Sequence, residues 1–556
     1  MSTKSKKTSN STEVLIVGAG MSGLFTAWRL LKEKPTTKVT ILEKMGQVGG
    51  RLETTFVDIK GHDGKTYKVH DEEGGMRFVP RGKGMEHLWG LIDAINEENK
   101  KYPEAQLNTV DFVMRDDNNR YYVRGKSFSQ AEAKKGNQAI WATLFNLAPN
   151  EQGKDPSDIL KEVMNDIQDQ NSIKRPSSPA EWAHFRNNCT YKNFEGKAIP
   201  INKWGFWSIL RNYGLTEECI EMLSHVVGFM GPFQDYINAG EGLQILFDFP
   251  DPKNAHFQTL EKGFQSLPNA LAALIKGAGG SIHLKETVKS VTKTDSGYSI
   301  DTSHGSYTAS KVILAIPKKP LKELIKVSPI LSGNEKFMSA VNSVQNMELT
   351  KVGLYFKERW WHQAQKINLT NGPNFTDLPL GSVYSFSQFP ADSIADNNYN
   401  GPAALTQYTD YIRGNFWKEM QNVGESYQSE EFPKNPPGTT ACSTSLVNEI
   451  MRQIKLLFGL DEDAYVPKPV LTTYRVWGQA PYGFGYHQYK LNIDDLKDVY
   501  PHITSPAKDL FVCNESWSPE QGWVEGALIM SDYVLQQEAF GLPAFATDSF
   551  ARTIKS

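Results

Sequence analysis

Three glycines near the start of the chain have the spacing that a dinucleotide site requires. Gly18, Gly20 and Gly23 form a GxGxxG pattern directly after the apolar run of residues 14–17. One glycine permits a tight turn, one lets the backbone approach a pyrophosphate, and one lets helix and strand pack closely. The helix that should follow presents free backbone N–H groups to the phosphates. The pattern therefore predicts a dinucleotide-binding site.

An acidic residue completes this pattern. A second apolar run, residues 39–42, ends at Glu43, twenty residues beyond Gly23. An acid at this distance accepts hydrogen bonds from the ribose hydroxyls of adenosine and disfavours a 2′-phosphate. A glycine-rich turn without a ligand is the alternative. Strand, glycine turn, helix and acid nevertheless occur here in the order that the site requires.

The residues after Glu43 favour FAD over NAD. Gly49, Gly50 and Arg51 follow, beginning six residues after the acid. Here the sequence resembles the flavin amine oxidase family, whose pattern continues from the ribose acid through a variable loop into Gly-Gly-Arg. The resemblance implies that Arg51 reaches the FAD pyrophosphate, a role that suits a planar and always charged guanidinium.

The resemblance extends to the far end of the chain. Residues 510–513 form another apolar run, and Glu515, Gly522 and Trp523 follow in the family's order. It implies that Glu515 binds FAD, that Gly522 and Trp523 wall the substrate site, and that a helix starting near residues 524–527 points at the flavin. A helix N-terminus supplies positive potential where the reduced flavin becomes anionic. An ordinary core residue is the alternative for Trp523.

An arginine at position 77 decides between subgroups of this family. Gly75, Met76, Arg77 and the Phe-Val-Pro that follows resemble a segment of L-amino acid oxidases and tryptophan monooxygenases. There the arginine holds the substrate α-carboxylate, and the resemblance implies this role for Arg77. A carboxylate buried beside an apolar flavin face needs such a partner. The preceding glycines suggest close approach of the backbone to a ligand. An exposed arginine in a turn is the alternative.

Three residues in the second half of the chain also match the family. Lys351, in an alternating run at residues 350–356, matches a lysine that holds a water near flavin N5. Without the family, a solvated lysine would be the simpler interpretation. Tyr384 aligns with a tyrosine that donates a second hydrogen bond to the substrate carboxylate. Trp477 opens a segment beside the flavin in which some relatives carry a covalently bonded cysteine; this chain has none there.

These matches define the residues that we expect to contact a non-covalently bound FAD. In relatives, the backbone at the position of Val288 contacts the adenine. The expected cofactor-binding residues are Gly18, Gly20, Met21, Ser22, Gly23, Glu43, Lys44, Gly50, Arg51, Gly75, Met76, Arg77, Val288, Trp477, Glu515, Gly522, Trp523, Val524 and Ala527. The expected catalytic residues are Arg77, Lys351, Tyr384 and Trp523.

A stretch between about residues 128 and 250 lacks these motifs and shows helical periodicity. Relatives place a helical cap here, which shapes the side-chain pocket. Some relatives carry a histidine near its end, where ungapped counting puts Phe247. His225 lies nearby but does not match, so no histidine base is assigned. Asp248 and Asp251 could select a cationic side chain, although a solvated loop is the simpler interpretation.

The composition excludes several other classes. A formal charge of -3 gives no basic footprint for nucleic acid. The four cysteines are far apart, without the spacing of a metal site or a disulfide scaffold, and we expect no metal. No apolar run reaches the length of a membrane span, and the first residues are polar. We therefore expect a cytoplasmic protein without membrane contact, with export by a signal-independent route left open. We also expect a homo-oligomer, a dimer or higher.

The length of 556 residues exceeds what one hydrophobic core supports, so the chain should divide into domains. The expected fold is α/β, with a discontinuous FAD-binding Rossmann-like domain of the glutathione-reductase type, a mixed-sheet substrate domain and a helical cap. We assign residues 10–75, 255–335 and 487–545 to the FAD-binding domain, residues 76–127 and 336–486 to the substrate-binding domain, and residues 128–254 to the cap.

The resemblance implies oxidative deamination of an L-amino acid. Hydride would pass from Cα to flavin N5, the imino acid would hydrolyse to a 2-oxo acid and ammonia, and O2 would reoxidise the flavin to give hydrogen peroxide. The expected partners are an L-amino acid and O2. An amide-forming 2-monooxygenase, an amine or polyamine oxidase, and a catalytically silent FAD-binding protein are the alternatives. The preferred side chain, large and apolar or cationic, stays open.

Overall fold

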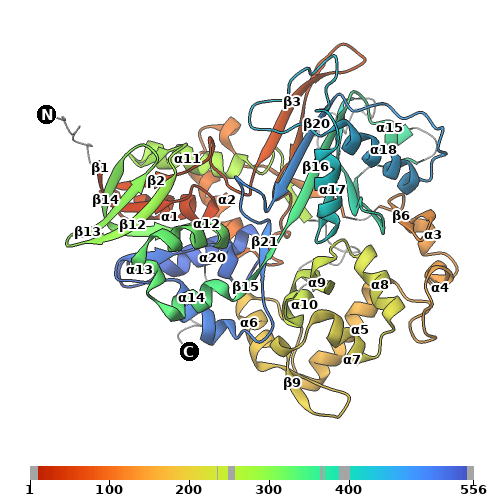
Figure 1. Cartoon of the computed structure of the whole chain (residues 1–556), viewed down its shortest axis with the longest axis horizontal. Coiled ribbons are helices and arrows are strands. Elements are labelled where there is room, and N and C mark those ends of the chain that lie inside the picture. The colour runs from red at the N-terminus through yellow and green to blue at the C-terminus, as the bar shows by residue number, and fades with distance from the viewer. Residues whose placement is uncertain are drawn as a thin grey trace.

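The computed structural model describes most of the chain and has three parts. The described residues are 10–114, 116–234, 236–247, 257–363, 367–369, 371–386 and 401–546. In Figure 1 a sheet with helices lies at the left, a second sheet at the upper right, and a group of helices at the lower right. Red, green and blue segments meet in the left part, so both ends and the centre of the chain build it together.

Five parallel strands form the middle of the left part. In spatial order they are β11 (Ser281–His283), β2 (Val39–Leu42), β1 (Asn10–Val17), β14 (Ser306–Leu314) and β22 (Leu510–Val512). The first half of β14 pairs with an antiparallel ribbon of β13 (Gly297–Thr302) and β12 (Val288–Thr294). The predicted α/β fold, a Rossmann-like sheet assembled from separate stretches of sequence, is confirmed.

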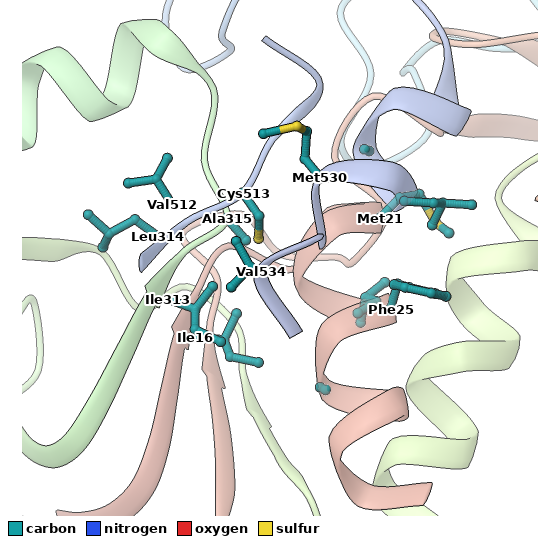
Figure 2. Packing of buried hydrophobic residues seen from close by; sticks show 14 of the residues in the cluster. Ile16, Met21, Phe25, Ile313, Leu314, Ala315, Val512, Cys513, Met530 and Val534 are labelled. Carbon is teal, nitrogen blue, oxygen red and sulfur yellow. The ribbon is translucent and has the colours of Figure 1, made fainter. Parts of the chain in front are cut away.

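Several helices contribute apolar side chains to the hydrophobic core that this sheet also forms. They are α1 (Met21–Glu33), α2 (Glu86–Glu98), α11 (Ser266–Gly277), α12 (Lys318–Val327), α13 (Pro329–Ser332), α14 (Glu335–Asn342), α19 (Tyr500–Ile503) and α20 (Val524–Leu535). Figure 2 shows side chains of β1, β14 and β22 meeting those of α1 and α20. Ser531 Oγ in α20 donates to Ser22 O in α1 at 3.1 Å, which fixes the first helix against the last.

The second sheet is mixed and has seven strands. Their order is β20 (Leu471–Trp477), β16 (Leu349–Phe356), β19 (Ala403–Asp410), β18 (Ser382–Phe386), β17 (Gly372–Thr376), β6 (Arg120–Val123) and β7 (Lys126–Ser129). Associated helices are α15 (Trp360–Gln363), α17 (Arg413–Asn422) and α18 (Thr444–Phe458). The hairpin of β3 (Thr54–Lys60) and β4 (Thr66–Glu72) packs against this sheet. Every residue of β16 is buried, so the interpretation of Lys351 as a solvated side chain is wrong.

The predicted helical stretch is confirmed by the lower right part of Figure 1. It contains α3 (Gln130–Ala133), α4 (Ala139–Leu144), α5 (Pro156–Asn171), α6 (Pro179–Asn188), α7 (Phe206–Tyr213), α8 (Glu217–Val226), α9 (Gly231–Gln234) and α10 (Ala239–Phe247), with a small hairpin of β8 (Thr190–Lys192) and β9 (Ala198–Pro200). Arg186 in α6 anchors these helices to the left part, because its Nη2 lies 2.7 Å from Asp495 Oδ2.

Two strand pairs join segments that the sequence assigned to different domains. They are β5 (Thr109–Phe112) with β10 (Phe257–Leu260), and β15 (Val344–Met347) with β21 (Tyr486–Tyr489). The two sheet-containing parts are therefore connected by backbone hydrogen bonds, and Asn238 N of the helical part donates to Tyr489 O at 3.1 Å. Among the described residues, no helix has both the length and the apolar character needed to cross a membrane. All four cysteines are buried and free.

Candidate active site

A cavity of about 760 Å³ lies where the carboxyl ends of the parallel strands meet the second sheet. Ligands of such folds bind at these strand ends. All the expected cofactor-binding residues except Gly23 line this cavity, from Gly18 after β1 to Ala527 in α20. Of the expected catalytic residues, Arg77, Lys351 and Trp523 line it, and Tyr384 does not.

The glycines of the turn after β1 meet two different structural requirements, which are close packing of the chain and open space at the cavity wall. Gly18 has φ +102°, and a Cβ there would lie 2.7 Å from Ala315 O. A Cβ on Gly23 would lie 2.0 Å from Gly18 O, so Gly23 serves the close packing of α1 on β1 and lies behind the lining. A Cβ on Gly20 would meet no described atom within 4 Å. Gly20 thus leaves open space at the cavity wall.

Two backbone amides orient the carboxylate of Glu43 at the end of β2. Oε2 accepts a hydrogen bond from Ala19 N at 2.8 Å, and Oε1 accepts one from Met45 N at 2.8 Å. Each carboxylate oxygen can accept more than one hydrogen bond. Glu43 is therefore held in place at the wall where the sequence predicts the ribose hydroxyls.

Arg51 and Glu515 form an ion pair at the middle of the cavity wall. Arg51 Nη1 lies 2.5 Å from Glu515 Oε2 and donates to Gly485 O at 3.1 Å. Burial favours a raised pKa for Glu515, but Arg51, His487 and the Gly522 amide outweigh it and hold the pKa at about 2. Glu515 is thus ionised, and its charge keeps the guanidinium against the wall.

Two helix N-termini face the cavity. Met21 and Ser22 begin α1, and Val524 begins α20; all three line the cavity. In the described structure neither helix has a side-chain hydrogen bond at its N-cap. The free N–H groups and the helix dipoles give this wall positive potential.

A buried histidine fixes the start of α20 from behind. The nitrogens of His87 lie 3.0 Å from Glu525 Oε1 and 3.3 Å from Asp532 Oδ2, both in α20. The same Glu525 accepts the backbone N–H groups of His87 and Leu88 at the start of α2. Burial favours a lowered pKa for His87, but the two carboxylates raise it to about 9. The resulting imidazolium locks α20 against α2.

Arg77 is buried at the cavity wall among aromatic rings, with 7% of its surface exposed. Its guanidinium carbon lies 5.1 Å from the ring centroid of Phe257, 5.5 Å from that of Phe112 and 5.8 Å from that of Tyr384. Trp523 stacks on Phe257 with 5.9 Å between the ring centroids. The alternative of an exposed turn arginine is therefore wrong.

The glycines before Arg77 lie close to the backbone of the Gly-Gly-Arg loop. A Cβ on Gly74 would lie 1.9 Å from Arg51 O, and Gly75 N donates to the same carbonyl at 2.8 Å. Both glycines also line the cavity, so their close approach to a ligand stays a prediction. They let the Arg77 loop run directly over the Gly-Gly-Arg loop, and this contact places Arg51 and Arg77 on one cavity wall.

Lys351 reaches this wall from β16. Its Nζ donates to Glu72 O at 2.9 Å and to Gly74 O at 2.6 Å. Nζ also lies 5.0 Å from the ring centroid of Tyr408. Burial lowers the pKa of Lys351 to about 8, although the nearby carboxyls of β4 oppose this shift.

Tyr384 lies behind Arg77 instead of at the cavity surface. It is 1% exposed, and its ring contacts those of Phe112 and Tyr408. Tyr408, on the neighbouring strand β19, lines the cavity. Tyr408 was missed in the sequence because its position follows from pairing across strands, and no local motif marks it.

The helical part contributes two apolar residues to the cavity wall, and the sequence analysis missed both. Phe229, after α8, and Ile245, in α10, line the cavity. The Phe229 ring meets that of Tyr408 edge-on, with 5.8 Å between the centroids. A buried apolar residue in a helix looks the same in sequence whether it faces a core or a cavity, so only the fold reveals these two.

Of the other cap residues considered, His225 and Phe247 lie outside the cavity lining. His225 has its Nε2 2.9 Å from Glu221 Oε1 and its Nδ1 2.6 Å from Arg413 Nη2. The carbonyl of Phe247 accepts a hydrogen bond from Arg175. Asp248 and Asp251 lie outside the described residues.

Comparison with known proteins agrees with this geometry. The family model of flavin-containing amine oxidoreductases matches residues 21–425. The chain belongs to this family. The protein is therefore a flavin-dependent oxidoreductase. The cavity combines a glycine turn, an acidic residue and two helix N-termini, a set of groups that suits FAD.

Relatives of this flavin-containing amine oxidoreductase cover nearly the whole chain. Achacin of Lissachatina fulica is 24% identical over 95% of this chain and 93% of its own. The putative L-amino-acid oxidase YobN of Bacillus subtilis is 25% identical over 93% of this chain and 92% of its own. The solved structure of putrescine oxidase bound to putrescine has a TM-score of 0.62 at 16% identity, covering 94% of this chain and 98% of that one. This last similarity shows the fold.

Proposed function

We propose that this protein is an FAD-dependent oxidase that converts L-amino acids to 2-oxo acids, ammonia and hydrogen peroxide. The observation that carries the proposal is the guanidinium of Arg77, buried at the flavin cavity among three aromatic rings. Relatives with the name L-amino-acid oxidase support it, including one from Gloydius halys that is 24% identical over 68% of this chain.

The residues of the cavity suit FAD. Glu43 would accept the ribose hydroxyls, and Arg51 and the start of α1 would hold the pyrophosphate. Gly20 offers space for this group, because a Cβ on this residue would have no described atom within 4 Å. No cysteine or histidine occurs among the described residues that line the cavity, which supports binding without a covalent bond.

Arg77 would clamp the α-carboxylate of the substrate. A guanidinium presents several N–H donors in one plane and can bind a carboxylate through two parallel hydrogen bonds. The rings of Phe257, Phe112 and Tyr384 hold its plane and exclude water, which strengthens the ion pair. A simple amine has no group for this clamp to bind, so the clamp favours amino acids over amines.

Bound FAD would supply the redox chemistry, taking a hydride from Cα and passing the electrons to O2. The chain's own part is positioning. Arg77 fixes the carboxylate end of the substrate, and Phe229, Ile245 and Tyr408 surround the space beyond it. The start of α20 supplies positive potential to the cavity. Such positioning removes much of the entropic part of the barrier.

A screen of the twenty amino acids and their decarboxylated amines tests this function. Purified holoenzyme is assayed for peroxide, 2-oxo acid and amide. The proposal expects peroxide and 2-oxo acid in equal amounts from at least one L-amino acid, with little activity toward the matching amine. Amide as the main product would establish the monooxygenase alternative. Faster turnover of amines would establish an amine oxidase, and flavin that no substrate bleaches without O2 would indicate a silent FAD-binding protein.

A further inference from the structure

Three consecutive carboxyls are buried next to Lys351. Asp71, Glu72 and Glu73, at the end of β4, are each 3% exposed. They directly precede the loop that carries Arg77. Carboxyls are seldom buried unless they are paired or hydrogen-bonded, so each of the three needs a structural reason.

Glu72 and Glu73 are buried because their carboxylates accept hydrogen bonds from the hairpin and from residues next to it. Glu72 accepts hydrogen bonds from Thr54 Oγ1 at 2.8 Å and from Phe264 N at 2.8 Å. Glu73 accepts one from Thr55 Oγ1 at 2.9 Å. Both hold the loop from β4 to Arg77 in place.

Asp71 occupies a space that β16 leaves for it. Its Oδ1 accepts hydrogen bonds from Thr406 Oγ1 at 2.5 Å and from Glu72 N at 2.8 Å. Its Oδ2 lies 2.8 Å from where a Cβ on Gly353 would be. Gly353 is two residues beyond Lys351 and therefore shares its face of the strand. A larger residue at 353 would displace the Asp71 carboxyl.

The nitrogen of Lys351 has one hydrogen-bonding position left for the cavity. Two of its positions are used by the carbonyls of Glu72 and Gly74, and the residue lines the cavity. A charged amine would present an N–H there, and a neutral amine would present a lone pair.

Charged groups from several elements surround this amine. Asp71 and Glu72 of β4 and the following Glu73 favour its protonated form, and Arg77 opposes it. Tyr408 of β19 presents its ring. Arg475 of β20 is the register partner of Lys351 and is bound to Glu53.

The amine and two neighbouring carboxyls bind protons with similar strength. Burial lowers the pKa of Lys351 to about 8 and raises the pKa of Asp71 to about 7 and that of Glu72 to about 8. Close to neutral pH, the Lys351 amine can therefore give up or accept a proton at small cost.

We propose that Lys351 accepts the proton that the substrate α-ammonium must lose before oxidation, and that Asp71 is a positioning residue that acts through Lys351. The inference rests on the proposed function. The lysine –NH2 takes one proton from the substrate –NH3⁺ and becomes –NH3⁺, and the substrate keeps a neutral amine. The lone pair of that amine then supports departure of the hydride from Cα. Ionised Asp71 stabilises the lysine ammonium that results.

The rate of flavin reduction by an amino acid without O2, measured against pH, tests this role. Asp71→Asn removes an anion that favours protonated Lys351, so the pKa of Lys351 falls. We expect the acid limb of the profile to move to lower pH by about one unit. Lys351→Met removes the acceptor and should slow reduction by about 10²–10⁴-fold, the usual contribution of a general base. Reoxidation by O2, measured separately, should change less than reduction does.

Two further variants keep the test decisive. Asp63→Asn, at the exposed turn of the same hairpin, removes one charge far from Lys351 and should leave the profile unchanged. Thr406→Val removes the hydroxyl that favours ionised Asp71, so it should move the acid limb in the same direction by a smaller amount. This variant serves if Asp71→Asn does not fold.

A binding measurement separates this role from simple damage to the site. The affinity for a substrate-shaped carboxylate without an amine, followed by its effect on flavin absorbance, should be the same in wild type, Asp71→Asn and Lys351→Met. An unmoved acid limb in Asp71→Asn and Thr406→Val, or unaffected reduction in Lys351→Met, would overturn the inference. A wild-type flavin that no amino acid reduces would instead contradict the proposed function itself.

Discussion

The side chains of Arg51 and Glu515, 464 positions apart in the chain, form an ion pair with 2.5 Å between Nη1 and Oε2. Arg51 belongs to the glycine loop near the N-terminus, and Glu515 follows the last parallel strand. Because both residues line the cavity, this cavity is complete only when the two ends of the chain have met.

Replacing Glu515 should weaken the fold in a pH-dependent way. Its pKa of about 2 in the folded protein lies below the ordinary value of 4.5, so its contribution is complete above 4.5 and is lost as the pH falls toward 2. This gap corresponds to about 3 kcal/mol. We expect Glu515→Gln to lower the thermal midpoint at pH 7 and the difference from wild type to shrink below pH 4. Glu97→Gln, which breaks an exposed pair with Lys100, should do neither.

Two glycine variants should separate folding from cofactor binding. Gly23→Ala places a Cβ 2.0 Å from Gly18 O and should destabilise the protein by several kcal/mol. Gly20→Ala places its Cβ in open space at the cavity wall and should leave the stability of the FAD-free protein within about 1 kcal/mol. Its affinity for FAD, measured by titration of the FAD-free protein, should fall at least tenfold. Equal FAD affinity in Gly20→Ala and wild type would place the pyrophosphate elsewhere.

His87 predicts a loss of stability on the alkaline side. Its pKa of about 9 lies above the ordinary value of 6.5, so its contribution is complete below pH 6.5 and is lost as the pH rises through 9. We expect the wild-type thermal midpoint to decline over this range and His87→Gln to start lower and decline less. Parallel curves for the two proteins would show that the ring is neutral in the folded state.

The cap residue Phe229 should influence which side chains are accepted. Phe229→Ala removes one wall of the cavity, and we expect kcat/KM for the bulkiest amino acids to rise about tenfold relative to that for small ones. Phe247→Ala, in the same part of the chain but outside the cavity lining, is the matched control. An unchanged order of preference in Phe229→Ala would place the substrate side chain against another wall.

The sequence was sufficient to predict those site residues whose position depends only on a local structure with a local sequence pattern. The turn from β1 to α1, the acid after β2 and the segment from Glu515 to Trp523 all reach the cavity, because glycine and helix-start signals are local. Tyr408 and Phe229 were missed because their positions depend on strand register and on how the cap packs. Tyr384 matches the family motif, yet its ring lies behind Arg77, since a motif cannot say which side of a packed arginine a neighbour occupies.

The second sheet also shows that a short stretch of sequence does not reveal which residues the fold buries. Residues 350–356 alternate in sequence, which is typical of a strand with one solvated face, but β16 is covered on both faces. The covering comes from the β3–β4 hairpin and from helices far along the chain. Lys351 therefore becomes a buried group with two carbonyl partners, an outcome that no short window of sequence contains.

The activity of an Arg77→Ala holoenzyme toward one amino acid and its decarboxylated amine tests the central claim most directly. If Arg77 clamps the carboxylate, kcat/KM for the amino acid should fall by about 10²–10³-fold, which corresponds to a lost charge-assisted pair in a dry site. The value for the amine should stay within a fewfold of wild type, and the FAD content should not change. An equal fall for both substrates, or no fall for the amino acid, would contradict the account.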